Sequence, residues 1–107
     1  MLYLVQGDVG TQVRATITEN DTGDIVDLSD STTVLKFRKK GVSTVLATLT
    51  NQSSSEDSAL GIATFIFGNG VLNIDPGNYE GEIESTFSDG SVKTVYEKVE
   101  FSLREDF

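Results

Sequence analysis

Three glutamates at alternate positions are the residues of this chain whose spacing comes nearest to that of a catalytic pair. Glu80, Glu82 and Glu84 lie in a run of alternating residues, so in a strand their side chains would point to one face. Two carboxylates on one face can hydrolyse a glycoside if a cleft surrounds them and one pKa is raised. A solvated sheet face explains the row without either condition, so we expect no enzymatic activity and no catalytic residue.

Other motifs that could bind an ion or a phosphate have simpler explanations. Aspartates at every third position, Asp21, Asp24, Asp27 and Asp30, offer the oxygen ligands that calcium prefers, but no EF-hand pattern is present and aspartate is common in turns. The Gly-Asn-Gly at 68–70 precedes no helix and lacks the Walker lysine. The chain has no cysteine and no histidine, which excludes disulfides, Cys/His zinc sites and thiol or imidazole catalysis. We expect no metal ion and no cofactor.

The charges argue against nucleic acid as a partner. Eight lysines and arginines face seventeen aspartates and glutamates, which gives a net charge of −9 at pH 7. Binding to DNA or RNA relies on basic residues that neutralise phosphates. The one basic cluster, KFRKK at 36–40, could meet an acidic partner, but it is also typical of an edge strand whose charges discourage aggregation. The second reading is our expectation.

Neither a signal peptide nor a membrane segment is expected. The apolar start MLYLV has no basic region before it, and Gln6, Gly7 and Asp8 interrupt it. No stretch approaches the roughly 20 apolar residues that a membrane helix needs. We therefore expect no membrane partner, and a protein that acts where it is made or leaves the cell by another route, such as lysis.

One short motif, DPGNY at 75–79, is typical of a tyrosine corner. In Greek-key sandwiches a tyrosine near the start of the sixth strand donates its hydroxyl to the backbone a few residues upstream. Asp75, Gly77 and Tyr79 have the required spacing, and the glycine permits a sharp bend. The immunoglobulin disulfide is missing, because Gly81 stands two residues after the tyrosine instead of a cysteine. The motif predicts a structural role for Tyr79 rather than a ligand contact.

The elements that carry these motifs are strands, because apolar residues alternate in short runs between turn signals. Seven such runs in 107 residues predict one domain over 1–107, all-β, with the architecture of an immunoglobulin-like antiparallel sandwich. The polar segment at 51–59 is expected to be a mobile loop, and a parity change in the last run predicts a β-bulge near Glu97. The runs are 2–5, 12–19, 33–39, 45–50, 61–67, 78–87 and 92–103.

The alternation also divides core from surface. We expect Val45, Ala47 and Leu49 to face inward, which leaves Leu46 outside. If the strands at 45–50 and 61–67 are neighbours in one sheet, Leu46, Ile62 and Ile66 form an exposed apolar patch, our candidate assembly interface. The predicted core consists of Val13, Ile17, Leu35, Phe37, Leu49, Phe65, Tyr79, Ile83 and Phe101.

The order of the short motifs resembles a known family. Gln6-Gly7-Asp8 precedes a strand, Val26-Asp27-Leu28 follows a polar turn, and the strand at 33–40 ends in basic residues. The stretches GIATFIF at 61–67 and PGNYEGEIESTFSDG at 76–90 continue the match. The chain is similar to the immunoglobulin-like N-terminal domain of phage baseplate upper proteins and related small phage tail proteins.

This resemblance implies a virion component, assembled in the host cytoplasm, that docks in the tail and helps to hold receptor-binding proteins. Its implied partners are other tail or baseplate proteins and further copies of itself, and it implies no catalytic residue. Baseplate upper proteins usually continue into a segment that engages the receptor-binding part, whereas this sequence stops at Phe107. The expected function is therefore protein–protein assembly in the tail, without an implied receptor-binding role.

A second hypothesis belongs to a different class. An accessory domain that recognises a host-surface carbohydrate or protein could use the same fold, and sugar sites usually present exposed aromatic side chains. Tyr3, Tyr96 and Phe107 are the candidates, and the chain has no tryptophan. The small number of candidates favours the assembly hypothesis.

Overall fold

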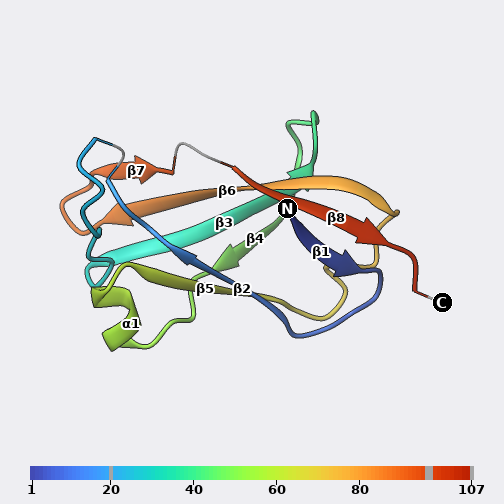
Figure 1. The fold of residues 1–107 in the computed structure, drawn as a ribbon, viewed down its shortest axis with the longest axis horizontal. Coiled ribbons are helices and arrows are strands. Elements are labelled where there is room, and N and C mark those ends of the chain that lie inside the picture. Colours follow the sequence, from blue (N-terminus) through green and yellow to red (C-terminus); the bar gives the residue numbers. More distant parts are fainter. Residues whose placement is uncertain (20, 96–97, 107) are drawn as a thin grey trace.

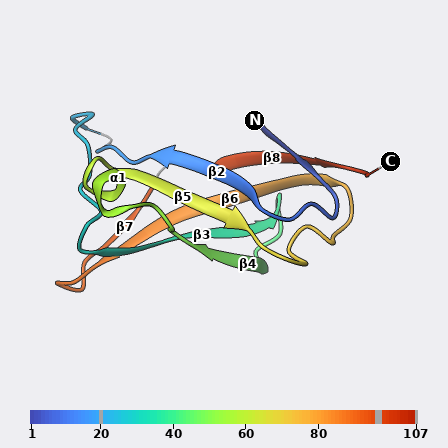
Figure 2. The same ribbon diagram turned by 90° about the horizontal axis from the view of Figure 1, so that it is seen from below.

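The computed structural model describes residues 1–19, 21–95 and 98–106, and in this part of the chain it is mostly β, with two sheets facing each other (Figures 1 and 2). The described elements are eight strands and one short helix. They are β1 Leu2–Val5, β2 Thr11–Thr16, β3 Ser31–Lys39, β4 Val45–Thr50, α1 Ser55–Ala59, β5 Ile62–Phe67, β6 Gly77–Phe87, β7 Val92–Thr94 and β8 Val99–Arg104.

The two sheets differ in size. The larger runs in the order β1-β8-β6-β3-β4, with β7 also beside β6, and the smaller contains β2 and β5. Every pair of strands is antiparallel except β1 and β8, which are parallel. A mostly-β, sandwich-like fold is thus confirmed, whereas the expectation of purely antiparallel sheets is wrong at β1.

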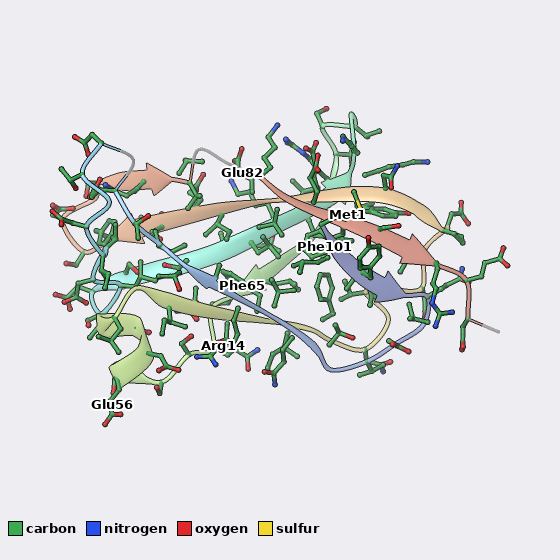
Figure 3. The ribbon with its side chains drawn as sticks, in the orientation of Figure 1. Met1, Arg14, Glu56, Phe65, Glu82 and Phe101 are labelled. Atoms are coloured by element: carbon green, nitrogen blue, oxygen red, sulfur yellow. The ribbon has the colours of Figure 1, made fainter. Side chains whose placement is uncertain are left out.

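The alternation predicted which side chains fill the space between the sheets. All nine residues of the predicted core are buried. Phe37 occupies the centre, with its ring 5.1 Å from that of Phe67, 5.3 Å from Tyr79 and 5.4 Å from Phe101. Phe65 from β5 and Phe101 from β8, both labelled in Figure 3, are also completely buried. Since these rings come from both sheets, they fasten the smaller sheet to the larger one.

The last predicted strand is two strands, so the count is eight rather than seven. β7 pairs with the end of β6, from Glu84 to Thr86, and β8 pairs with its beginning, from Gly77 to Gly81. The registers of β7 and β8 on β6 differ by two residues, so odd-numbered residues keep the same face in both strands. Val92 is 58% exposed, so its assignment to the core, on which the expected parity change rested, is wrong. The bulge expected near Glu97 falls outside the described residues.

The polar segment at 51–59 contains helix α1 instead of being only a loop. The Ser54 side chain accepts a hydrogen bond from the backbone N–H of Asp57, which caps the first turn. Gly61 follows the helix with a φ of +77°, and its N–H donates to the carbonyl of Ser58. The serine cap and the glycine are the signals in the sequence, but five residues are too few to show a helical period.

The hairpin between β3 and β4 contains a register shift that the alternation does not reveal. Phe37 pairs with Ala47 and Arg38 pairs with Val45, so Leu46 is an additional residue on β4. Val45 is consequently 43% exposed, and the prediction that it faces the core is wrong. Leu46 is exposed, as predicted.

None of the helices in the described ranges is long and apolar enough to cross a bilayer.

Candidate functional site

The contacts of Tyr79 are those of a residue that stabilises the fold. The Tyr79 hydroxyl donates to the backbone carbonyl of Asp75, four residues upstream. The ring stacks on Phe37 with an interplanar angle of 13°, and burial followed by the negative charge of Asp75 raises the pKa of the phenol. Gly77 opens β6 with a φ of +152°, a conformation that side chains disfavour. These contacts position the loop before β6 against the sandwich.

Replacing Tyr79 with phenylalanine should remove that hydrogen bond and keep the ring stack. Because Asp75 is exposed, water can take the place of the hydroxyl, and we expect a loss of about 1 kcal/mol in the free energy of unfolding. Urea denaturation of the wild type and the Tyr79→Phe variant checks this value. An unchanged midpoint would show that the hydrogen bond contributes nothing to the corner.

The glutamate row and the basic cluster lie side by side on the outer face of the larger sheet. Lys36 contacts Glu84 at 3.3 Å between nitrogen and oxygen, and Arg38 contacts Glu80 at 3.2 Å. The strand that carries KFRKK lies between β6 and β4, so the prediction of a charged edge strand is wrong. Two residues of the basic cluster instead pair with two of the glutamates across a central pair of strands, which neither motif reveals alone.

Glu80 is the most buried of these carboxylates, with 9% of its surface exposed. Its burial by itself would raise the pKa, but the N–H of Gly41 and the positive charges of Lys98 and Arg38 outweigh it, and the net pKa is lowered. A general acid of a glycosidase needs the opposite shift. Glu80 and Glu84 therefore serve as ion-pair partners, and Glu80 lacks the raised pKa that a general acid requires.

The lowered pKa of Glu80 predicts acid sensitivity. Its contribution to stability is fully present above the usual value of 4.5 and is lost as the pH falls through the lower value of the folded state. Glu80→Gln should therefore flatten the fall of the unfolding midpoint below about pH 4.5. Thermal melts between pH 7 and pH 3 measure it. Glu82→Gln is the matched control, because Glu82 forms no ion pair with any described residue, and an equal effect in both variants would contradict the assignment.

Among the aspartates considered for calcium, Asp27 holds a turn with its carboxylate. The Asp27 carboxylate accepts from the N–H of Ser29 at 2.9 Å and from its hydroxyl at 2.6 Å, and these bonds lower the pKa of Asp27. Asp89 and Ser91 repeat the same arrangement. Within residues 1–19, 21–95 and 98–106, no group of three or more acidic, histidine or cysteine side chains is placed to hold a metal ion.

The buried hydroxyls are also engaged with one another. Thr33 and Ser85 lie 2.7 Å apart across β3 and β6, and Ser31 links Thr33 at 2.9 Å to the carbonyl of Leu28 at 2.8 Å. In the described part of the chain every buried side-chain nitrogen or oxygen has a hydrogen-bond partner. This network holds the first residues of β3 in place. It does not have the arrangement of a catalytic nucleophile beside a general base.

The residues of the predicted patch, Leu46, Ile62 and Ile66, lie on strands of two different sheets. β4 pairs with β3 in the larger sheet, whereas β5 pairs with β2 in the smaller, so the assumed neighbours belong to different layers. The parity was right, because Ala63, Phe65 and Phe67 are buried and both isoleucines are outside the core, but the isoleucines are only half-exposed. Leu46 is 48% exposed and belongs to the larger sheet, whereas the two isoleucines belong to the smaller one.

Leu46 instead borders a groove that the sequence did not reveal. The groove measures about 410 Å³ and lies between the β3–β4 hairpin and the loop before β6. Val42, Leu46 and Ile74 supply apolar walls, and Lys39 and Asp75 supply the two charges. Since hairpin and loop are 30 residues apart in sequence, only the pairing of β3 with β6 brings them together. The full lining is Lys39, Val42, Thr44, Leu46, Asn73, Ile74, Asp75 and Tyr79.

Comparison with known proteins adds little to this description. No protein-family model matches the chain, and no curated protein matches it by sequence. One of the solved structures that resemble it is the soluble domain of PmoD from Methylocystis sp. ATCC 49242 (Rockwell), with a TM-score of 0.48 and 13% identity. That match covers 95% of this chain and 77% of the other. A likeness at this level carries no argument about family or function.

Proposed function

We propose that this protein is a structural component of a bacteriophage tail or baseplate, an assembly module with an immunoglobulin-like fold. The order of its short sequence motifs, from Gln6-Gly7-Asp8 to the stretch at 76–90, resembles that of phage baseplate upper proteins and small tail proteins. In this role the chain binds other tail proteins and further copies of itself in the virion. It performs no catalysis.

The single observation that best supports this proposal is the arrangement of five strands around the tyrosine corner. In immunoglobulin-like domains strands B and E share one sheet, strands C, F and G share the other, and the corner tyrosine lies near the start of strand F. Here β2 and β5 share one sheet, β3, β6 and β8 share the other, and Tyr79 is the third residue of β6. This agreement supports the fold that the resemblance implies, and the function follows by analogy at the level of the family.

The exposed apolar residues are consistent with an assembly role. Leu2 and Tyr3 lie on β1, and Val45 and Leu46 lie on β4, the two outer strands of the larger sheet. Their exposed fractions range from 42% to 80%. A tail component must bury surface against its neighbours, and both edges of this sheet offer apolar side chains for such contacts.

Removal of the gene from the phage that encodes this chain tests the assembly role. We expect filled heads to accumulate without functional tails, and purified protein added to the extract should restore infectious particles. Cell lysis and DNA packaging should proceed normally. Complete, infectious particles in the absence of the chain would contradict the proposal.

One observation supports the alternative of a carbohydrate-binding accessory domain. Tyr3 is 80% exposed on β1, and among the described aromatic side chains it is the one most open to solvent. A single ring of this kind is a stacking surface for a sugar. Glycan-array binding that Tyr3→Ala abolishes would favour this alternative, while absence of binding would remove it.

A further inference from the structure

The outer strand β4 lacks the features that usually protect the edge of a sheet. It pairs with β3 on one side, and in the described part of the chain no strand pairs with its other side. Its residues, VLATLT, include no charge and no proline. The bulge at Leu46 interrupts the pairing of β4 with β3 near the start of β4. The residues that follow, Ala47, Thr48, Leu49 and Thr50, pair with β3 in regular register. Edges of this kind accept an additional strand.

The other outer strands offer less to a partner. β2 carries the charged Arg14 in its middle, and the segment after β4 covers β5, because the N–H of Gln52 donates to the carbonyl of Thr64 at 2.8 Å. β1 is uncharged but has four residues, and β7, which among the described strands pairs with β6 alone, has three residues and carries Lys93. β4 therefore combines greater length, absence of charge and an open side.

The groove described above lies at the beginning of this edge and shares Leu46 with it. A segment that pairs with β4 would pass the groove, whose volume of about 410 Å³ accommodates a large apolar side chain between Val42, Leu46 and Ile74. Strand addition gains affinity from backbone hydrogen bonds and specificity from such hollows beside the edge. The edge and the groove thus form one composite surface.

The positive charge of Lys39 favours a negatively charged group in whatever binds this surface. Six of the eight basic residues form ion pairs with described residues, and Arg104 has other interactions. Lys39, exposed on the groove, is the one that has no ion pair within the described part of the chain. On a protein with a net charge of −9, a free ammonium beside apolar walls favours an occupant with a carboxylate. Asp75 on the opposite wall accepts hydrogen bonds, which suits a peptide N–H.

A single extended segment fits this edge better than a second folded copy. β4 contacts β5 of the facing sheet, so the smaller sheet lies close above the edge. Figure 2 shows β4 at the outer side of the larger sheet, with β2 and β5 in a separate layer on one side of it. If two copies paired through their β4 strands, the smaller sheet of one copy would meet the smaller sheet of the other. A single extended segment carries no second sheet, so it avoids this clash.

We propose that β4 and the adjoining groove are a strand-addition site for an extended segment of another protein, one with an apolar side chain next to a carboxylate. The apolar side chain enters the groove, the carboxylate pairs with Lys39, and the backbone extends the larger sheet beyond β4. This inference concerns a binding site and does not depend on the role in a phage tail.

Selection from a random library of 12-residue peptides, with the intact protein as target, tests the proposal. We expect selected peptides to share strand-forming residues with one apolar and one acidic position. Leu46→Asp and Lys39→Glu should each weaken their binding about tenfold or more, which corresponds to about 1.4 kcal/mol. Leu2→Asp on β1 is the matched control, because it places the same charge on an exposed leucine of the opposite edge.

Hydrogen exchange identifies the mode of binding. On addition of a selected peptide, backbone amides of β4 that face away from β3 should gain protection, while those of β1 stay unchanged. The proposal is overturned if no peptide is enriched, if binding survives both groove variants, or if Leu2→Asp alone abolishes it. Binding without protection in β4 would also overturn it, since the peptide would then not add as a strand.

Discussion

Replacing Phe37 with alanine should lower the free energy of unfolding by about 3–5 kcal/mol, the usual cost of removing a buried aromatic ring. Phe37 is completely buried, and its ring contacts those of Phe67, Tyr79 and Phe101 from both sheets. The substitution leaves a cavity at the point where the two layers meet. A domain of this size has a total stability of about 5–15 kcal/mol, so this loss would be a large fraction of the total.

Chemical denaturation of both proteins measures this loss. Tyr3→Ala is the control, because it removes an aromatic ring that is 80% exposed and should change stability by about 0.5 kcal/mol or less. If the Phe37→Ala variant loses no more than the control, the aromatic cluster is not what fastens the smaller sheet to the larger one.

The second large effect is expected at Gly61, between α1 and β5. Its φ of +77° disfavours any side chain, and an added methyl group would lie 2.9 Å from the carbonyl oxygens of both Ile17 and Val26. These oxygens belong to backbone that cannot rotate away, and the Gly61 carbonyl itself accepts from Ile17 N–H at 2.7 Å. Backbone strain and overpacking together should cost about 2–5 kcal/mol in a Gly61→Ala variant.

A second glycine separates these two causes. Gly70 has a φ of +84°, but an alanine methyl there would meet no atom within 4 Å. Gly70→Ala should therefore show the conformational cost alone, about 1–2 kcal/mol. Thermal melts of the two variants give the comparison. Equal losses would mean that Gly61 is required for its φ only and that the close approach of the strands is relaxed without cost.

The sequence predicted the parts of this fold that depend on local alternation. Along β5, Ala63, Phe65 and Phe67 fill the core at every second position, and this spacing is visible without a structure. The Tyr79 corner could be predicted for a similar reason, because its partner Asp75 is four residues away. In both cases the interaction that decides the structure is short in sequence.

Features that depend on distant pairing were missed. The prediction that β4 and β5 are neighbours in one sheet is wrong, because strands that follow each other in sequence belong here to different sheets. KFRKK was assigned to an edge because its partner strand, with Glu80 and Glu84, follows some 40 residues later. The groove has the same origin, since the β3–β4 hairpin and the loop at 73–75 meet only through the tertiary fold. Single-residue shifts, such as the bulge at Leu46, also leave no mark on composition.

The proposed role in a phage tail is tested most directly by the location of the protein in purified particles. Virions of the phage that encodes this chain can be separated into heads and tails and analysed by quantitative mass spectrometry. The proposal predicts peptides of this chain in the tail fraction, at a fixed ratio to the other tail proteins and absent from heads. Peptides that occur in infected cells but in no purified particle would contradict it.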